Sequence, residues 1–397
     1  MIDLRAARSN PDAIRAALAR RGDEGLFDAA IAADDVWREL VPQVDALRAK
    51  QRKPQGKPTP EELAELKQIK EELQALEEKL AAAEAERNEI LAKVPNPPDP
   101  SAPDGGEDDA VEIRRVGETG PGSGKEHTEV GRFEMDRAAK VSGARFGYIV
   151  GDTALLSMAL YRFALDRVSQ HGHTPMLPPV LVRDEAMYGT GFFPSDKGDY
   201  YEIPADGLYL VGTSEVPLAA FHMGDILEDV PMRYVAFSSC FRRESGSAGR
   251  DTRGMFRVHQ FQKVEMFVFC DPTTSAAEHE RILSIEEELV QAVGLPYRVI
   301  NVAAGDLGAS AAKKYDIEAW FPSQQRYREI TSCSNTTDYQ ARRLGVRWRE
   351  GEKQLTVPHT LNGTAVTDRW VLAILENFGG DVPDVLQSYG APARIES

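Results

Sequence analysis

Charged and aromatic side chains alternate with apolar ones along residues 257–269. Successive side chains of a strand point to opposite faces of a sheet, so this alternation predicts a strand with one polar and one apolar face. The polar face would carry Arg257, His259, Phe261, Lys263 and Glu265, and the apolar face Val258, Val264 and Met266. At about 3.3 Å per residue, Phe261 and Glu265 would lie about 13 Å apart, which suits the two ends of an elongated ligand. The pattern therefore predicts a binding site built on a sheet.

A polar pair and a cationic loop precede this predicted strand. Arg242 and Glu244 lie two residues apart on a predicted preceding strand, so we expect them to share a face. The loop at residues 245–254 is rich in Gly and Ser and carries Arg250 and Arg253, which suits a polyanionic ligand. For the isolated segment, a solvent-facing strand with ordinary charge pairs is the alternative interpretation.

The run at residues 241–265 closely resembles motif 2 of the class II aminoacyl-tRNA synthetases, in the form found in seryl-tRNA synthetases. Residues 209–217 resemble the amino-acid-binding segment of that family, residues 327–343 its metal and ATP segment, and residues 359–377 its motif 3. The likeness covers nearly the whole chain, in the family order, which is more specific than any single motif. It agrees with an α+β fold in which an antiparallel β-sheet catalytic domain flanked by helices follows an N-terminal antiparallel α-helical coiled-coil hairpin.

The resemblance implies ATP-dependent activation of L-serine to seryl-adenylate, followed by transfer of serine to serine tRNA. Activation requires a carboxylate to attack the α-phosphate of ATP, so cations must offset the charge, and no covalent enzyme nucleophile is needed. By resemblance, Arg242 clamps the α-phosphate, Arg257 assists at the phosphates, and Glu244 accepts from the adenine amino group. Phe261 and Arg369 would stack on the two faces of adenine. The predicted catalytic residues are thus Arg242, Arg257 and Arg369.

The resemblance also implies a wider set of ATP-binding residues. These are Arg242, Arg243, Glu244, Val258, His259, Gln260, Phe261, Glu329, Ile330, Thr331, Ser332 and Arg369. Glu329 and Ser332 would ligate Mg²⁺ through hard oxygen atoms, which fits their spacing on a predicted strand edge. Arg243, Thr336–Thr337 and Trp370 depart from the commonest form of the family. None of them replaces a residue with an assigned role, but they leave a specialised paralogue open.

Recognition of serine needs an acceptor for the ammonium group and a polar partner for the hydroxyl group. By resemblance, the serine-binding residues are Thr213, Ser214, Glu215, Glu265 and Thr364. A pocket that hydrogen-bonds the hydroxyl group should reject alanine strongly, because alanine would leave buried polar atoms unpaired. Threonine must instead be excluded by shape.

Apolar residues at three-and-four spacing predict two helices that pair as a hairpin, with arms at about residues 30–53 and 60–94. The seam comprises Trp37, Leu40, Val44 and Leu47 on the first arm, and Leu66, Ile69, Leu73, Leu76, Leu80, Ala83 and Ile90 on the second. Thr59 and Pro60 predict the start of the second helix, as an N-cap followed by proline at the first position.

The stretch at residues 48–57, at the tip of the predicted hairpin, is basic. It carries Arg48, Lys50, Arg52, Lys53 and Lys57 and contains no acidic residue. Because the formal net charge of −16 opposes binding to a polyanion, such a local cluster is what could contact tRNA. A solvated loop, or a coiled coil that serves oligomerisation, is the alternative. The resemblance implies that the hairpin reaches the long variable arm of serine tRNA, and that Arg250 and Arg253 guide its acceptor end.

Residues 94–109 are rich in Pro and acidic residues and predict a domain boundary. We expect an N-terminal tRNA-binding domain at residues 1–100 and a catalytic domain at residues 101–397. A predicted helix at residues 152–171, followed by an extended segment at residues 172–182, resembles motif 1, which implies a homodimer. An internal helix packed on the sheet is the alternative.

The three cysteines form no Cys-x-x-Cys pair, so neither a disulfide framework nor a zinc cluster is indicated. No apolar run is long enough to span a membrane, so we expect a cytoplasmic protein with no membrane partner. The resemblance implies a class II serine–tRNA ligase that also charges selenocysteine tRNA where the cell has one. A paralogue that supplies activated serine or seryl-tRNA to a biosynthetic or resistance pathway, and a noncatalytic regulatory protein on the same scaffold, are the alternatives.

Overall fold

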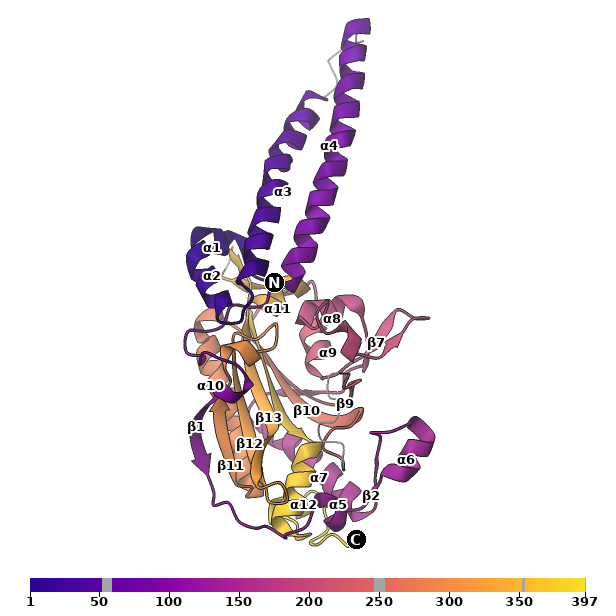
Figure 1. The fold of residues 1–397 in the computed structure, drawn as a ribbon, viewed down its shortest axis with the longest axis vertical. Helices are drawn as coiled ribbons and strands as arrows, with labels where there is room; N and C mark the ends of the chain where they lie inside the picture. The colour runs from indigo at the N-terminus through magenta and orange to yellow at the C-terminus, as the bar shows by residue number, and fades with distance from the viewer. Residues whose placement is uncertain (52–58, 246–253, 352–353, 397) are drawn as a thin grey trace. The chain divides into compact units, whose positions relative to one another are not determined.

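The structure, a computed structural model, describes residues 1–51, 59–245, 254–351 and 354–396. These residues divide into two units, Met1–Pro97 and Pro98–Ser397 (Figure 1). Long helices in the first unit and a large, mainly antiparallel sheet in the second confirm the expected α+β class. Within the described ranges, no helix is long and apolar enough to cross a membrane.

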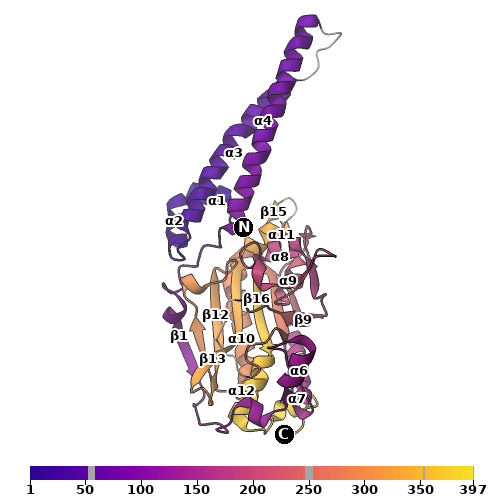
Figure 2. The same cartoon turned by 45° about the vertical axis from the view of Figure 1, so that its right-hand side comes forward.

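The first unit is helical and contains α1 (Leu4–Ser9), α2 (Pro11–Ala19), α3 (Glu24–Lys50) and α4 (Pro60–Lys93). Helices α3 and α4 run side by side (Figures 1 and 2). The predicted start of α4 is confirmed, because the Thr59 hydroxyl accepts a hydrogen bond from the Glu62 amide at 3.2 Å. The Glu62 carboxylate accepts in return from the Thr59 amide at 2.7 Å. This capping box satisfies two amides that the helix itself leaves unpaired.

The predicted seam is also confirmed, because every one of its residues is buried or partly buried, with Val44 and Leu73 among the buried ones. A buried charge lies beside it. Asp34 is 4% exposed and contacts the guanidinium groups of Arg8 at 2.7 Å and Arg87 at 3.5 Å. These two cations compensate the cost of removing the carboxylate from water.

The second unit is built on a sheet that has eight strands within the described residues. In spatial order they are β1 (Val111–Val116), β11 (Tyr297–Asn301), β12 (Lys313–Phe321), β13 (Arg326–Thr337), β16 (His359–Thr367), β10 (Gln260–Cys270), β9 (Met232–Phe241) and β4 (Thr174–Met176). Neighbouring strands are antiparallel, except that β4 is parallel to β9. Such a sheet can present one packed face and one polar face, which is the arrangement that the alternation at residues 257–269 predicts.

Three longer helices cover the apolar face of this sheet: α7 (Asp152–Gln170), α10 (Ser275–Val293) and α12 (Asp368–Phe378). Their buried side chains form the main core together with strand residues such as Val264 and Met266, both fully buried. Helix α7 begins at Asp152, as the sequence predicts.

Shorter elements cover one end of the opposite face, where Phe267 and Phe269 of β10 pack against α9 (Glu215–Ala220) and α11 (Tyr339–Leu344). The shorter helices are α5 (His127–Val130), α6 (Met135–Ser142), α8 (Asp184–Thr190), α9 (Glu215–Ala220), α11 (Tyr339–Leu344) and α13 (Asp384–Gln387). The shorter strands are β2 (Phe133–Glu134), β3 (Tyr148–Ile149), β5 (Leu181–Arg183), β6 (Glu202–Ile203), β7 (Leu208–Leu210), β8 (Ile226–Leu227), β14 (Arg347–Glu350) and β15 (Gln354–Thr356). The polar face is therefore closed at this end.

The predicted extent of the two central strands was wrong at their adjoining ends. Strand β9 ends at Phe241, so Arg242 and Glu244 follow it, and β10 begins at Gln260, so Arg257 precedes it. Beyond the end of β9, the backbone turns at Glu244, where φ is +52°. Alternation alone could not show this, because a polar residue that follows a strand and one that belongs to it look alike in sequence.

Candidate active site

Strand register brings polar residues of β10 and β16 to one face of the sheet. Lys263 pairs with Thr367, and Glu265 pairs with Thr364. Residues three apart point to opposite faces of a regular strand, so Thr364 and Thr367 should not face the same way. The register shift leaves Ala365 as an extra residue, a β-bulge that turns both threonines to the face of Glu265.

A second bulge acts in the same way on β13. Asp316 of β12 pairs with Ser332, and Glu318 pairs with Glu329. Asp316 and Glu318 share a face of β12, so their partners also share it, although these lie three residues apart. The extra residue in this register is Ile330. Strand β13 pairs with β16 only from Cys333 onward, so Glu329 and Ser332 lie on a stretch that has β12 as its one printed strand partner, which agrees with the predicted strand edge.

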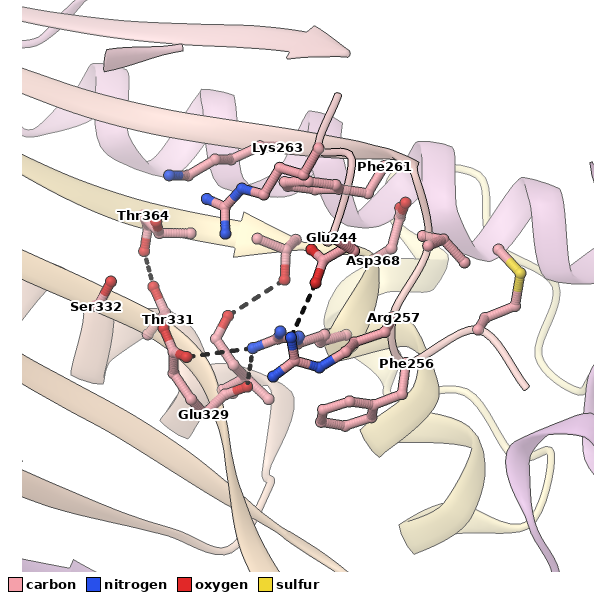
Figure 3. Close-up of a pocket in the computed structure, with 16 residues that line it drawn as sticks. Glu244, Phe256, Arg257, Phe261, Lys263, Glu329, Thr331, Ser332, Thr364 and Asp368 are labelled. Carbon is pink, nitrogen blue, oxygen red and sulfur yellow. Dashed lines mark hydrogen bonds and ion pairs between the residues drawn. The ribbon is translucent and has the colours of Figure 1, made fainter. Parts of the chain in front are cut away.

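These strands, the segment before β10 and the start of α12 line a pocket with about 700 Å³ of empty space (Figure 3). Its lining comprises Arg242, Glu244, Met255, Phe256, Arg257, Val258, Phe261, Lys263, Glu329, Ile330, Thr331, Ser332, Thr364, Thr367, Asp368 and Arg369. The three residues predicted to be catalytic lie together in this pocket.

Arginine side chains line the part of the pocket where the sequence predicts that the nucleotide binds. The Arg257 guanidinium contacts the Glu244 carboxylate at 2.9 Å (Figure 3). The Arg242 guanidinium carbon lies 5.3 Å from the centre of the Phe261 ring, and its Nε donates to the Gly212 carbonyl at 3.2 Å. A planar cation over an aromatic face marks a position that can also accept a flat base.

Arg369 of α12 donates to both the side chain and the backbone of Glu329, at 3.3 Å and 3.1 Å. Burial opposes ionisation of the Glu329 carboxyl, but nearby cations, first Lys314 and then Arg369, hold its pKa well below its usual range. The Glu329 carboxylate is therefore charged at neutral pH. It can act as a hard ligand for a divalent cation.

The oxygen donors of the pocket suit a magnesium ion with open coordination positions better than a metal ion enclosed by protein ligands. Among the described residues, no group of three or more His, Cys, Asp or Glu side chains is placed to hold a metal ion. Glu329 and Ser332 instead offer two oxygen atoms on one face and leave other positions free. Mg²⁺ is commonly bound by one or two carboxylates together with water and substrate phosphates.

A compact polar cluster lies beside the arginines. Glu265 is 1% exposed, and its Oε2 atom lies 2.7 Å from the Lys263 ammonium. The Thr364 hydroxyl donates to the same carboxylate at 3.1 Å, and Lys263 donates to the Thr213 hydroxyl at 3.1 Å. Burial raises the pKa of Glu265, while the Lys263 ammonium opposes that shift. The cluster thus presents a buried acceptor with a cation already attached.

Glu215 of α9 lies behind this cluster. Its Oε1 atom accepts hydrogen bonds from Gln340 at 2.6 Å and from Asn362 at 2.9 Å. Burial, together with the neighbouring Glu265 carboxylate, raises the pKa of Glu215 to about 7. Ser214 is fully buried next to it. Of the residues predicted to bind serine, Thr364 lines the pocket, whereas Thr213, Ser214, Glu215 and Glu265 do not.

Some predicted nucleotide-binding residues lie beside the pocket. Val258 lines it, but Arg243, His259 and Gln260 do not. The Arg243 guanidinium carbon lies 5.5 Å from the Tyr201 ring centre, and Nδ1 of His259 lies 2.9 Å from the Arg242 carbonyl. Arg243, His259 and Gln260 lie near the site because they are close to Arg242 or Phe261 in the sequence.

The predicted tRNA contacts can be placed only in part. Arg48, in the last turn of α3, forms an ion pair with Glu77 of α4 at 2.8 Å, whereas Lys50 is exposed. The remaining predicted contacts, Arg52, Lys53, Lys57, Arg250 and Arg253, lie outside the described residues.

Lys263, Phe256 and Asp368 belong to the pocket although the sequence assigned them no role. Lys263 follows the polar alternation, so a signal for it existed. Asp368 accepts from the Tyr161 hydroxyl and, at 2.9 Å, from the Gln262 amide, and burial raises its pKa to about 6. Nothing in the sequence distinguishes Phe256 from an ordinary core residue.

Two family models match the chain. Residues 1–98 match the seryl-tRNA synthetase N-terminal domain, and residues 201–378 match the tRNA synthetase class II core domain (G, H, P, S and T). A serine–tRNA ligase of Mycolicibacterium vanbaalenii is 48% identical over 392 residues, which cover 95% of this chain and 94% of the relative. A serine–tRNA ligase of Thermobifida fusca is 45% identical, with 98% and 97% covered.

Solved structures of the same kind superpose on nearly the whole chain. The seryl-tRNA synthetase of Pyrococcus horikoshii, solved with ATP, has a TM-score of 0.91 and 38% identity, and the match covers 100% of this chain and 99% of that one. The cytoplasmic serine–tRNA ligase of Naegleria fowleri, solved with AMP, has a TM-score of 0.86 and 32% identity, with 98% and 96% covered.

Proposed function

The chain belongs to the seryl-tRNA synthetase family and is a class II serine–tRNA ligase, which activates serine and charges tRNA. We propose which of its residues bind ATP, which bind serine and which contact tRNA. The single observation that supports the division is the shared polar face. Bulges at Ile330 and Ala365 add Glu329 and Thr364 to the same surface as Phe261 and Glu265.

In the proposed activation step, an oxygen of the serine carboxylate attacks the α-phosphorus of ATP. The bond from that phosphorus to the β-phosphate oxygen breaks, and pyrophosphate leaves. Arg242 and Arg257 hold the phosphates, and Arg369, whose guanidinium plane stacks on adenine, also offsets the charge that develops on the phosphates. Glu329 and Ser332 would hold Mg²⁺, which supplies further positive charge to the phosphates. Positioning and charge then account for the rate.

Glu265 accepts the serine ammonium group in this proposal, and the Lys263 ammonium opposes the rise that burial causes in the pKa of Glu265. Thr213, Glu215 and Thr364 provide the polar surroundings of the serine hydroxyl. Two observations support this assignment: the cluster is buried, and its far end is closed by α9 and α11. In the transfer step, the terminal ribose hydroxyl of tRNA attacks the mixed anhydride and AMP leaves.

Serine-dependent ATP–pyrophosphate exchange tests this function. We expect exchange with serine. With alanine, kcat/KM should be about 10⁴-fold lower, because alanine leaves buried polar groups unpaired. Threonine should also be poor, since its extra methyl group does not fit the closed end. Absence of exchange with serine would contradict the proposal and would favour a noncatalytic role on the same scaffold.

We further propose that the helix pair α3–α4 contacts the long variable arm of serine tRNA, and of selenocysteine tRNA where the cell has one. The exposed Lys50, at the end of α3, supports this assignment. We expect deletion of the variable arm to lower kcat/KM for charging by about tenfold or more, through lost phosphate contacts. Exchange without tRNA should be unchanged.

Charge reversal locates that contact on the protein. Lys50→Glu should raise the KM for tRNA, and more so at low salt, because charge–phosphate contacts weaken as salt rises. Lys93→Glu is the matched control, since Lys93 lies at the other end of α4. Equal effects of the two substitutions, or full charging of tRNA without its variable arm, would overturn this part of the proposal.

A homodimer is proposed from apolar side chains that the described unit leaves exposed. On α7, Leu155 is 52% and Met158 is 62% exposed, and Leu177 in the following segment is 83% exposed. Exposed apolar side chains that gather on one surface are typical of association surfaces. A molar mass of two chains by light scattering tests this, and a mass of one chain would contradict it. The use of tRNA also places the enzyme in the cytoplasm in this proposal.

A further inference from the structure

We propose that His127 is a positioning residue for ATP, because its ring fixes the backbone at Gly254 and Met255 and thereby sets Phe256 and Arg257 in the pocket. The inference rests on the proposed function, which assigns the nucleotide to the side of the pocket that contains Arg257 and Arg369.

The hydrogen bonds of His127 define which nitrogen carries the proton. Nδ1 lies 2.9 Å from the Glu376 carboxylate, which accepts, and Nε2 accepts from the Met255 amide at 3.3 Å. An ionised carboxylate cannot donate, so the hydrogen is on Nδ1 and the lone pair on Nε2 faces Met255. The ring thus connects α12, which contains Glu376, to the chain that enters β10.

Both partners are buried and further held. His127 is 5% exposed, and Glu376 is fully buried. The Glu376 carboxylate also accepts from the Ser323 amide at 3.2 Å and from the His127 amide at 3.4 Å. Although burial opposes ionisation, the hydrogen bond from His127 lowers the pKa of Glu376, so its carboxylate stays charged. A ring anchored in this way can hold a backbone amide in one place.

Close packing at Gly254 gives a second, independent restraint. Its φ is +65°, and a Cβ atom at this position would lie 2.4 Å from Nε2 of His127. Only glycine therefore allows the backbone to approach the ring so closely. The imidazole contacts the chain immediately before Met255 as well as at its amide.

The restrained residues lead directly into the pocket. Met255, Phe256 and Arg257 all line it. Two cations lie over the Phe256 ring, with the Arg369 guanidinium carbon 4.9 Å and the Arg328 guanidinium carbon 3.8 Å from its centre. A shift at Met255 would move this ring and the adjacent Arg257 together.

Helix α12 completes the connection. Arg369 and Glu376 lie seven residues apart on α12, which is about two helical turns, so both project from similar sides of the helix. One rigid helix therefore carries a phosphate-side cation and the anchor for His127. This fixes Arg369 relative to Phe256 and Arg257, which come from a distant part of the sequence.

A purely structural role and a positioning role make different predictions. Loss of a structural residue lowers the unfolding temperature and the amount of active enzyme, and leaves both KM values alone. Loss of a positioning residue on the nucleotide side raises the KM for ATP and leaves the KM for serine unchanged. The two constants are measured in the same exchange assay.

The test compares His127→Phe, which removes both hydrogen bonds but keeps an aromatic ring, with His127→Gln, whose side-chain carbonyl can still accept from Met255. We expect His127→Phe to raise the KM for ATP about tenfold, the usual effect of one lost buried hydrogen bond. His127→Gln should stay within about threefold of the wild type. His171→Phe is the matched control, because His171 also contacts a glutamate, Glu288 at 2.8 Å, but lies away from the pocket.

The proposal is overturned if His127→Phe leaves the KM for ATP unchanged, raises both KM values equally, or is no worse than His127→Gln. If His127→Phe does not fold, Gly254→Ala decides by the same criteria, because its Cβ atom would displace the ring. A wild-type enzyme without serine-dependent exchange would instead contradict the proposed function, so the two failures are distinct.

Discussion

Replacement of Glu265 by glutamine is expected to lower kcat/KM for serine-dependent exchange by about a hundred- to a thousandfold. Glutamine keeps the shape of the side chain but removes the charge that would bind the substrate ammonium group. It also leaves the Lys263 ammonium, 2.7 Å away, without its buried carboxylate. Truncating one partner of a buried charge pair costs about 2–5 kcal/mol, which corresponds to that loss. The KM for serine should carry most of the effect, and the KM for ATP little.

Glu278→Gln is the matched control for this substitution. Glu278 is also buried and paired, with Arg233 at 2.5 Å, but Arg233 does not line the pocket, whereas Lys263 and Thr364, the partners of Glu265, do. Its substitution should lower the unfolding temperature without changing the KM for serine. If Glu265→Gln keeps kcat/KM for serine within threefold of the wild type, Glu265 is not the ammonium acceptor.

Arg369→Ala is expected to reduce kcat for exchange by about a thousandfold, since an arginine that offsets transition-state charge in phosphoryl transfer contributes 10³–10⁵. Arg369→Lys should recover little, because lysine has neither the planar stacking surface nor the fixed fork of donors. Arg369 also donates to the Glu329 backbone and side chain, so its loss frees a predicted magnesium ligand. The KM for serine should change less than kcat.

Arg281→Ala provides the comparison. Arg281 is exposed, and its guanidinium donates a hydrogen bond to the His171 carbonyl, away from the pocket. We expect it to exchange at the wild-type rate. Full activity of Arg369→Lys would show that a point charge is sufficient at this position. An effect confined to the KM for serine would place Arg369 at the serine end of the pocket instead of the nucleotide end.

Local sequence signals predicted much of the fold. The helix pair followed from apolar spacing and from the Thr59 cap, and the polar face of β10 from the alternation around Lys263. These signals are local, because caps and pleats depend on neighbouring residues. The ends of β9 and β10 were not predictable in the same way, since Arg257 could equally extend a strand or follow a turn.

The site was harder to predict than the elements that build it. The sequence places Glu329 and Ser332 three apart, which in a regular strand would separate them, and nothing in β13 alone reveals that Ile330 is an extra residue. Register is decided by the partner strand, so a bulge is a property of two segments together. The role of Phe256 is hidden for the same reason, because its partners Arg328 and Arg369 come from distant segments.

The two bulges make strand register, rather than side-chain identity alone, a feature on which the chemistry depends. If the same residues formed an unbroken ladder, Glu329 and Ser332, and likewise Thr364 and Thr367, would point to opposite faces, because they lie three apart. One member of each pair would then point into the hydrophobic interior. In these strands, greater regularity and enzymatic competence are therefore opposed.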